Sequence, residues 1–474
     1  MFHHNAVKRE GFSAEMNYMD FLKRKEITIE NTGFEPDELN PNLFDFQRDI
    51  VSWALRKGKA ALFEDTGLGK TIQQLAWADA VAKHENGKVL ILAPLAVSRQ
   101  TAKEAQKFGI QCKLCESDED VVDGVNITNY EKIHHFDTDQ FCGIVLDESS
   151  ILKSYSGKTT GEMINRFRFT PYKLACTATP SPNDFTELGN HAEFLNVMTM
   201  NEMLSMFFIN DSSNGIGWRL KGHSVSDFFK WIAEWAIMIK SPADLGFDAS
   251  KYILPALRIH NIITESPSKE GMLFAMPAET LQERRQARKD SLEIRVQRAK
   301  EIVGQTDDQA LVWCNYNDES EALRKAIKGS YEVKGSDTPE HKENGMMGFS
   351  EGTVKYLVSK PSICGFGMNW QNCHKMIFCG LSDSYEQFYQ AIRRCYRFGQ
   401  THEVDVYVIT SEAESNILNN IKAKQARHEL MSVEMLKVIN TVTKEKLYSM
   451  SFEHSNYIPQ EEVIIPTFLK GEAT

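Results

Sequence analysis

The stretch FEDTGLGKT, residues 63–71, decides how the rest of this sequence is interpreted. It follows the apolar run AALFE (60–64), which predicts a short buried strand, and it opens GKTIQQLAWADAVAKH (69–84), whose apolar residues have helical spacing. A glycine-rich turn between a strand and a helix is the context that a phosphate-binding loop requires. Gly67 and Gly69 allow the backbone to curl so that its N–H groups face phosphate oxygens.

The side chains of this loop have expected partners in a bound nucleotide. Lys70 is expected to reach the β- and γ-phosphates of ATP, and the Thr71 hydroxyl is expected to bind Mg²⁺. Thr66 joins the two glycines as a nucleotide-binding residue, and the dipole of the following helix favours the anion. The loop departs from the strict GxxxxGKS/T pattern, because Glu64 occupies the first glycine position.

A second apolar strand ends in LDESS (146–150). Its two adjacent carboxylates have separate expected roles: Asp147 binds Mg²⁺, and Glu148 orients and deprotonates the attacking water. This division suits phosphoryl transfer, which depends mostly on positioning and on charge stabilisation.

The stretch QAIRRCYRFGQ (390–400) adds positive charge to the expected site. Arg394 and Arg397 are three residues apart, so a continuous helix would place them on one face. From that face they would meet the γ-phosphate across a cleft, where an arginine stabilises transition-state charge. The predicted catalytic residues are therefore Lys70, Asp147, Glu148, Arg394 and Arg397.

Two blocks of alternating strand and helix patterns surround these motifs. The strand candidates are residues 60–64, 88–94, 125–130, 143–148 and 173–179 in the first block, and residues 310–316, 355–360, 375–380 and 404–410 in the second. Near-continuous apolar strands that alternate with helices indicate parallel α/β sheets. The expected divisions are an N-terminal accessory segment (1–42), a first lobe (43–195), a helical insertion (196–280), a second lobe (281–430), and a C-terminal helix and tail (431–474).

The net charge of the chain limits the functions that the sequence permits. The net charge of -11 argues against a protein that coats nucleic acid with its whole surface, but it permits one local groove for DNA. Residues 281–300 predict a basic helix, which is either a solvated face, the commoner case, or a helix that faces DNA or links the lobes. No run of about 18 apolar residues occurs and the first residues lack a signal-peptide pattern, so we expect no membrane partner and a cytoplasmic protein, in the host cytoplasm if it is viral.

In order and spacing, the motifs resemble those of the superfamily-two helicases (DEAD/DEAH-box relatives), and among these the Swi/Snf (Snf-two) translocases. The matching stretches are LFDFQRDI (43–50), LAPLAV (92–97), ITNYEKI (127–133), LDESSILKS (146–154), TATPSPNDFTEL (177–188), GFGMNWQ (365–371) and QAIRRCYRFGQ (390–400). The TGLGKT form of the first loop is common in that superfamily. The compact chain is similar to members encoded by phages and bacteria.

The resemblance implies a fold of two RecA-like lobes with a helical insertion, with ATP and Mg²⁺ as ligands. It implies that Gln47 reads adenine and that Gly367 and Asn369 couple ATP to DNA. The other coupling residues that it implies are Thr177, Thr179, Pro180, Asn183 and Gln390. The implied DNA contacts are Ser98, Thr128, Asn315 and Asn369, with Lys360 added on its charge.

The sequence departs from the family pattern at two positions. Ser150 replaces a usual histidine, which is expected to weaken coupling between hydrolysis and DNA, and Arg393 replaces a common acidic residue. The implied function is an ATP-dependent translocase or helicase that tracks on double-stranded or branched DNA, with replication or recombination proteins as expected partners. Two alternatives stay open, an RNA or single-strand helicase and a nucleotide-gated DNA-binding scaffold with little turnover.

Overall fold

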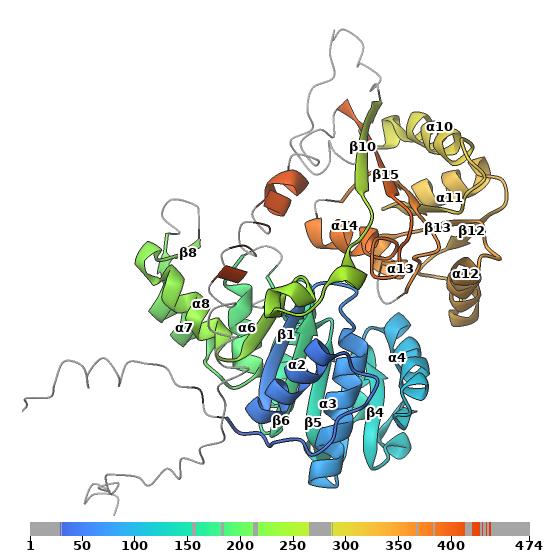
Figure 1. The fold of residues 1–474 in the computed structure, drawn as a ribbon. Helices are drawn as coiled ribbons and strands as arrows, with labels where there is room; N and C mark the ends of the chain where they lie inside the picture. Colours follow the sequence, from blue (N-terminus) through green and yellow to red (C-terminus); the bar gives the residue numbers. More distant parts are fainter. Residues whose placement is uncertain are drawn as a thin grey trace, which may run out of the picture.

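Two parallel sheets, each flanked by helices, form two lobes of this computed structural model (Figure 1). The structure describes residues 29, 31–153, 158–181, 184–211, 217–264, 286, 288–365, 368–382, 384–412, 420–426, 429, 433, 436 and 437. Within these ranges, no helix has the length and apolar character needed to cross a membrane.

The first sheet has seven parallel strands in the order β3-β4-β2-β5-β6-β1-β9. Its strands are β1 (Lys59–Glu64), β2 (Lys88–Ala93), β3 (Cys112–Leu114), β4 (Gly124–Asn129), β5 (Phe141–Asp147), β6 (Tyr172–Thr177) and β9 (Ala236–Ile239). Its helices are α2 (Asp45–Lys57), α3 (Lys70–Glu85), α4 (Leu95–Lys107), α5 (Lys158–Arg166), α6 (Glu187–Phe194), α7 (Met200–Phe207) and α8 (Val225–Ala233).

Both faces of this sheet are buried, which explains its near-continuous apolar strands. Along β1, Ala60 and Leu62 pack in the same core as residues of α2 and α3. Ala61 and Phe63 pack on the opposite face, in the same core as residues of α6, α7 and α8. The carboxyl ends of β1 and β5 therefore open at one edge of the sheet, where the predicted nucleotide motifs lie.

The second sheet has six parallel strands in the order β10-β15-β14-β11-β13-β12. Its strands are β10 (Leu257–Thr264), β11 (Ala310–Trp313), β12 (Ser330–Val333), β13 (Tyr356–Ser359), β14 (Lys375–Cys379) and β15 (Val404–Ser411). Its helices are α10 (Leu292–Val303), α11 (Asn317–Ala326), α12 (Pro339–Glu351), α13 (Pro361–Cys364) and α14 (Tyr385–Ile392). Helices α10 and α11 share one core, and α12 and α14 share the core on the other face.

The predicted helical insertion at 196–280 is wrong as a single unit. It does contain α7, α8 and a hairpin of β7 (Phe208–Asn210) and β8 (Trp218–Leu220). However, β9 joins the first sheet beside β1, and β10 joins the second sheet beside β15. The strand β9 is buried along its whole length, so it shows no alternation of apolar and polar residues that would separate it from the preceding helix.

Candidate nucleotide and nucleic-acid site

The phosphate-binding loop lies between β1 and α3, as the sequence predicts. Gly67 and Gly69 have φ angles of 90° and 83°, which a side chain disfavours. A Cβ on Gly67 would also lie 2.9 Å from the backbone nitrogen of Phe398, which comes from the second lobe. Lys70 points back into the loop, where its Nζ donates to the carbonyl oxygens of Glu64 at 2.8 Å and Asp65 at 3.2 Å.

The carboxylates of Asp147 and Glu148 lie at the carboxyl end of β5. Gln74 of α3 donates to Asp147 Oδ1 at 2.8 Å, and the Tyr130 hydroxyl donates to the Asp147 backbone oxygen at 2.7 Å. Burial raises the pKa of both carboxyls, whereas the positive charge of Lys70 lowers each pKa. Glu148 has a φ of 55°, a left-handed conformation that costs a non-glycine residue about 1–2 kcal/mol. The tight strand end therefore holds Glu148 in a strained position beside Asp147.

The two predicted arginines reach the same region from the second lobe, although they do not share a helix face. Helix α14 ends at Ile392, so Arg394 and Arg397 lie in the turn that follows it. Arg394 is buried and donates to the backbone oxygens of Gln390 at 3.1 Å and Met368 at 3.4 Å. Its positive charge acts with that of Lys70 to lower the pKa of Asp147 and Glu148 against the larger effect of their burial.

Arg397 is the second arginine of this turn. Burial, together with the neighbouring positive charge of Arg394, lowers its pKa to about 10, while Glu104 of the first lobe opposes this shift. The expectation that one helix face aligns the two arginines is wrong because the backbone leaves the helix before them. The turn, and not the helical period, determines where their charges lie.

Contacts between the lobes surround the loop. Asp65 accepts hydrogen bonds from the Arg393 guanidinium and the Tyr389 hydroxyl of the second lobe. Lys153 of the first lobe pairs with Glu386 of α14. Arg393, the residue that departs from the family pattern, thus binds a carboxylate of the opposite lobe directly beside the phosphate-binding loop.

The site has the groups that ATP and Mg²⁺ need. Asp147 and the Thr71 hydroxyl are oxygen ligands of the kind that Mg²⁺ prefers. Glu148 Oε2 is buried without a hydrogen-bond partner among the described residues, as expected of an acceptor for a water. These residues fit the metal ion and the nucleotide that the motifs imply.

Comparisons with known proteins agree with this geometry. Residues 46–211 match the family model of the SNF2-related domain, and residues 295–399 match that of the helicase conserved C-terminal domain. The first match contains the phosphate-binding loop and both carboxylates, and the second contains both arginines. The chain belongs to the Snf2-type helicases of superfamily two. The two matched domains indicate a nucleotide-hydrolysing activity of the helicase type.

Curated relatives of this Snf2-type helicase are much longer than the part that aligns. The SWI/SNF-related matrix-associated actin-dependent regulator of chromatin subfamily A-like protein 1 of Xenopus tropicalis is 33% identical over 143 residues, which are 28% of this chain and 15% of that protein. The protein of the same name from Xenopus laevis is 33% identical over 141 residues, which are 27% of this chain and 14% of that protein.

Two solved structures align with most of this chain, and the first of them supports its fold. S. cerevisiae Dbp5 bound to RNA and ADP BeF3 has a TM-score of 0.52 at 12% identity, covering 83% of this chain and 93% of that one. The Sulfolobus solfataricus SWI2/SNF2 ATPase core in complex with dsDNA is 18% identical with a TM-score of 0.40, covering 88% of this chain and 99% of that one. The fold of this Snf2-type helicase is thus a core of two RecA-like lobes.

Gln47, the predicted adenine reader of this Snf2-type helicase, is buried against the phosphate-binding loop. Its Nε2 donates to the Leu68 carbonyl at 2.7 Å, and its Oε1 accepts from the Phe44 backbone N–H at 3.0 Å. The side chain thus ties the start of α2 to the loop, and its contact with adenine stays a prediction.

The predicted coupling residues lie at the ends of β6 and α14. The Thr177 hydroxyl accepts from the Thr179 backbone N–H at 3.1 Å, and Pro180 is buried next to them. The side chain of Gln390 is buried, and both its amide nitrogen and its amide oxygen are without partners among the described residues. Asn183 and Gly367, predicted for coupling and nucleotide binding, lie outside the described residues.

His191 is a residue of this region that sequence reasoning missed. Its Nε2 lies 3.1 Å from Ser149 Oγ, so α6 contacts the residue that follows Glu148. Burial lowers the pKa of His191 to about 4, so the ring is neutral at pH 7. No local motif points to this histidine, because it meets Ser149 only through the packing of α6 on the sheet.

The predicted DNA contacts fall into two groups. Ser98 and Thr128 are both buried, and the Thr128 hydroxyl donates to the Cys115 carbonyl at 2.8 Å. Both hydroxyls are covered by protein in this conformation, and their contact with DNA stays a prediction. Asn315 and Lys360 are partly exposed at the carboxyl edge of the second sheet.

Asn369 lines a cleft of about 1180 Å³ between the lobes, and its buried Oδ1 is without a partner among the described residues. Basic and acidic side chains line this cleft in equal numbers, and Arg99 of the first lobe pairs with Glu343 of the second. The cleft is therefore not a uniformly positive groove in this conformation.

Proposed function

We propose that this Snf2-type helicase is an ATP-dependent translocase that tracks on double-stranded or branched DNA. The observation that carries the proposal is that the second lobe contacts the phosphate-binding loop of the first, through Arg393 on Asp65 and through Phe398 against Gly67. An ATPase whose catalytic groups come from two lobes completes its site only when the lobes approach. Hydrolysis then couples to relative movement of the lobes.

The residues have complementary roles in this proposal. Lys70 and the backbone of the loop bind the phosphates of ATP, and Glu148 takes the proton of the attacking water. Arg394 and Arg397 stabilise the charge that develops on the transferred phosphoryl group. Asp147 and the Thr71 hydroxyl would hold Mg²⁺, which would supply further neutralisation of that charge.

Contacts between the lobes define the closed position of this movement. The Asp65–Arg393 and Lys153–Glu386 pairs join the lobes beside the nucleotide site. Opening of the cleft breaks these pairs and exposes Lys153 and Arg393 to other anions. Each cycle of closure and opening would shift the second lobe along one strand of a duplex.

Two observations support DNA as the polymer. The first lobe matches the SNF2-related model over residues 46–211, and polar residues such as Asn315, Lys360 and Asn369 lie at the edge of the second lobe or in the cleft. We expect contacts mainly to DNA phosphates, which would give little sequence preference and a strong dependence on salt. Because the first lobe matches the SNF2-related model, replication and recombination proteins are also proposed as partners.

Steady-state ATPase activity tests the proposal. It is measured without polymer and with duplex DNA, branched DNA, single-stranded DNA and RNA, each at low and high salt, with Lys70→Ala as the control. We expect stimulation by duplex or branched DNA that fades with salt and is absent in Lys70→Ala. Stimulation by RNA or single strands alone would identify the other helicase class, and stimulation by none of them would leave a nucleotide-gated scaffold.

A further inference from the structure

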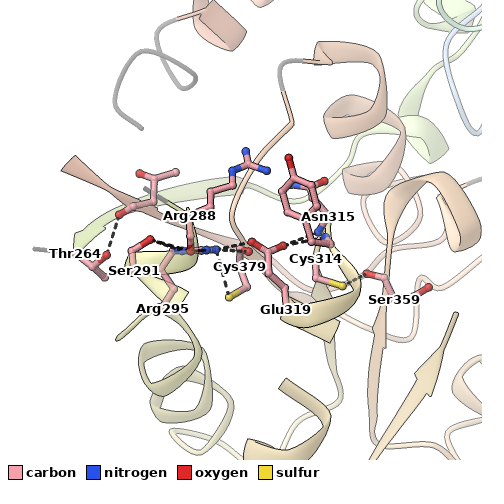
Figure 2. A network of polar contacts seen from close by, with 11 residues as sticks. Thr264, Arg288, Ser291, Arg295, Cys314, Asn315, Glu319, Ser359 and Cys379 are labelled. Atoms are coloured by element: carbon pink, nitrogen blue, oxygen red, sulfur yellow. Dashed lines mark hydrogen bonds and ion pairs between the residues drawn. The ribbon is translucent and has the colours of Figure 1, made fainter. Parts of the chain in front are cut away.

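A buried arginine organises the second lobe away from the nucleotide site. Arg295 of α10 is fully buried, with no exposed surface. Its guanidinium donates to Glu319 Oε1 at 2.9 Å, to the Cys379 carbonyl at 2.8 Å, to the Arg288 carbonyl at 2.8 Å and to Ser291 Oγ at 3.1 Å (Figure 2). One side chain thus joins α10, α11 and the end of β14.

The second oxygen of Glu319 has a different task. Glu319 Oε2 accepts from the backbone N–H groups of Asn315 at 2.8 Å and Tyr316 at 3.2 Å (Figure 2). Glu319 is the third residue of α11, where a carboxylate can bind the free N–H groups before a helix. The carboxylate therefore connects the buried guanidinium on one side to the turn between β11 and α11 on the other.

The turn held in this way presents polar groups at the surface of the second lobe. Tyr316 has 40% of its surface exposed, with the Arg288 guanidinium 5.2 Å from its ring. Lys360, from the end of the neighbouring strand β13, donates to Asn317 Oδ1 at 2.7 Å. An amide, a phenol and an ammonium group thus stand together at the carboxyl edge of the sheet.

Stability alone is a weak reason for the Arg295–Glu319 pair. Removing two charges from water costs about as much as their attraction returns, and apolar replacements of buried pairs are often as stable. The carboxylate of this pair also accepts from two backbone N–H groups, so the pair determines the position of a turn, which an apolar pair cannot do.

We propose that Arg295 and Glu319 are positioning residues for nucleic-acid binding, which hold the Asn315–Tyr316–Asn317 turn in the shape that contacts a DNA phosphate. The inference rests on the proposed function and adds to it the device that pre-forms one contact. A turn that is already ordered loses less conformational entropy on binding. Loss of the device should therefore weaken DNA binding without changing the chemistry of ATP hydrolysis.

Two double variants separate positioning from stability. Arg295→Met with Glu319→Gln removes both charges but keeps an amide oxygen that can accept from the turn. Arg295→Met with Glu319→Met removes both charges and that acceptor as well. Both variants lack the donors to the Ser291, Arg288 and Cys379 oxygens, so they differ mainly in the acceptor for Asn315 and Tyr316. Arg298→Met, in an exposed pair with Glu301 on the same helix, is the control.

The measurements are thermal stability, ATPase activity without polymer, the concentration of mixed-sequence duplex DNA that gives half-maximal ATPase stimulation, and amide hydrogen exchange of the turn. We expect the Met/Met variant to need about tenfold more DNA than the Met/Gln variant, the equivalent of one lost hydrogen bond to a charged or amide acceptor. Activity without polymer and the maximal rate at saturating DNA should agree within about twofold, because the nucleotide site is intact. Amide exchange at Asn315 and Tyr316 should rise in Met/Met alone.

The outcomes have distinct meanings. Equal DNA requirements in the two double variants, with the wild type stimulated by DNA, would overturn the inference. A wild-type protein that no DNA stimulates would refute the proposed function, and with it the DNA-binding role of the turn.

A single Glu319→Asp variant, which keeps the charge for Arg295 but shortens the reach to the turn, gives the same comparison if a double variant does not fold. It should resemble Met/Met in its DNA requirement.

Discussion

The two lobes differ in whether their buried charged side chains form ion pairs. In the first lobe, Glu64 and Asp147 are buried and Glu148 is partly buried, and within the described residues none of the three has an ion pair within 4.0 Å. In the second lobe, Arg295 and Glu319 are equally buried but bind each other at 2.9 Å. Buried charges without partners are costly, so a fold keeps them where a ligand completes them.

This difference indicates that the first lobe, whose buried carboxylates have no ion pair among the described residues, is the lobe suited to a cation and to phosphate. Burial raises the pKa of Glu64 to about 7, and Lys70 opposes the shift. At pH 7 such a group is close to half charged. The second lobe pairs Arg295 with Glu319 internally and presents Arg394 and Arg397 at the interface.

Arg397→Ala should have the largest effect on turnover. Loss of an arginine that stabilises the transition state should lower kcat by about 10³ while changing the KM for ATP little. Steady-state kinetics at saturating DNA measures both values, and the exposed Arg298→Ala serves as a control. An unchanged kcat would show that Arg397 does not face the γ-phosphate. Arg394→Ala should also lower thermal stability, since its guanidinium binds two backbone oxygens.

Glu148→Gln should retain ATP binding but lower hydrolysis by about 10²–10³, because an amide cannot take the proton of the attacking water. Nucleotide titration and single-turnover kinetics separate the two steps. Gln74→Leu, which removes the hydrogen bond to Asp147, should have a smaller effect. If Glu148→Gln hydrolysed ATP at the wild-type rate, the first lobe would hold its unpaired carboxylates for another reason.

Lys173→Met should change how stability depends on pH. Lys173 is buried, its Nζ donates to the Phe194 carbonyl at 2.8 Å, and burial lowers its pKa to about 7. Between pH 7 and the usual lysine pKa the unfolded chain binds more protons than the folded one, so this group makes stability rise with pH. From pH 7 to 9, the wild type should gain roughly 2 kcal/mol relative to Lys173→Met. Denaturant unfolding at both pH values measures this difference, and parallel curves would contradict it.

Reversal of the charges in the Asp65–Arg393 pair should have the smallest effect. Arg393→Asp alone should lower DNA-stimulated turnover about fivefold, because a carboxylate then faces Asp65 across the lobes. The double variant Asp65→Arg with Arg393→Asp should recover part of that loss. Turnover without polymer is compared in the same assay, and a double variant no better than the single one would show that the two side chains do not act as a pair.

Local sequence predicted the nucleotide site of the first lobe because its groups are close in the chain or at strand ends. Lys70 and Thr71 follow a glycine turn, and Asp147 and Glu148 follow a buried strand, so parallel topology brings them to one edge. The same reasoning predicted both lobes from apolar strands that alternate with helices. It was wrong about 196–280, since a fully buried strand such as β9 has no pattern of its own.

The class of fold, and the places where the glycine turn and the two adjacent carboxylates lie, follow from short-range patterns of turn, strand and charge. The positions of the other charges depend on tertiary packing. Arg295, in a segment expected to be a solvated face or a DNA-facing or linking helix, is buried against Glu319, and Thr128 donates to a backbone oxygen. The contact of Arg393 with Asp65 likewise needs two lobes to meet. Such pairings join residues far apart in the chain, and burial, which sets their energy, exists only once the chain has folded.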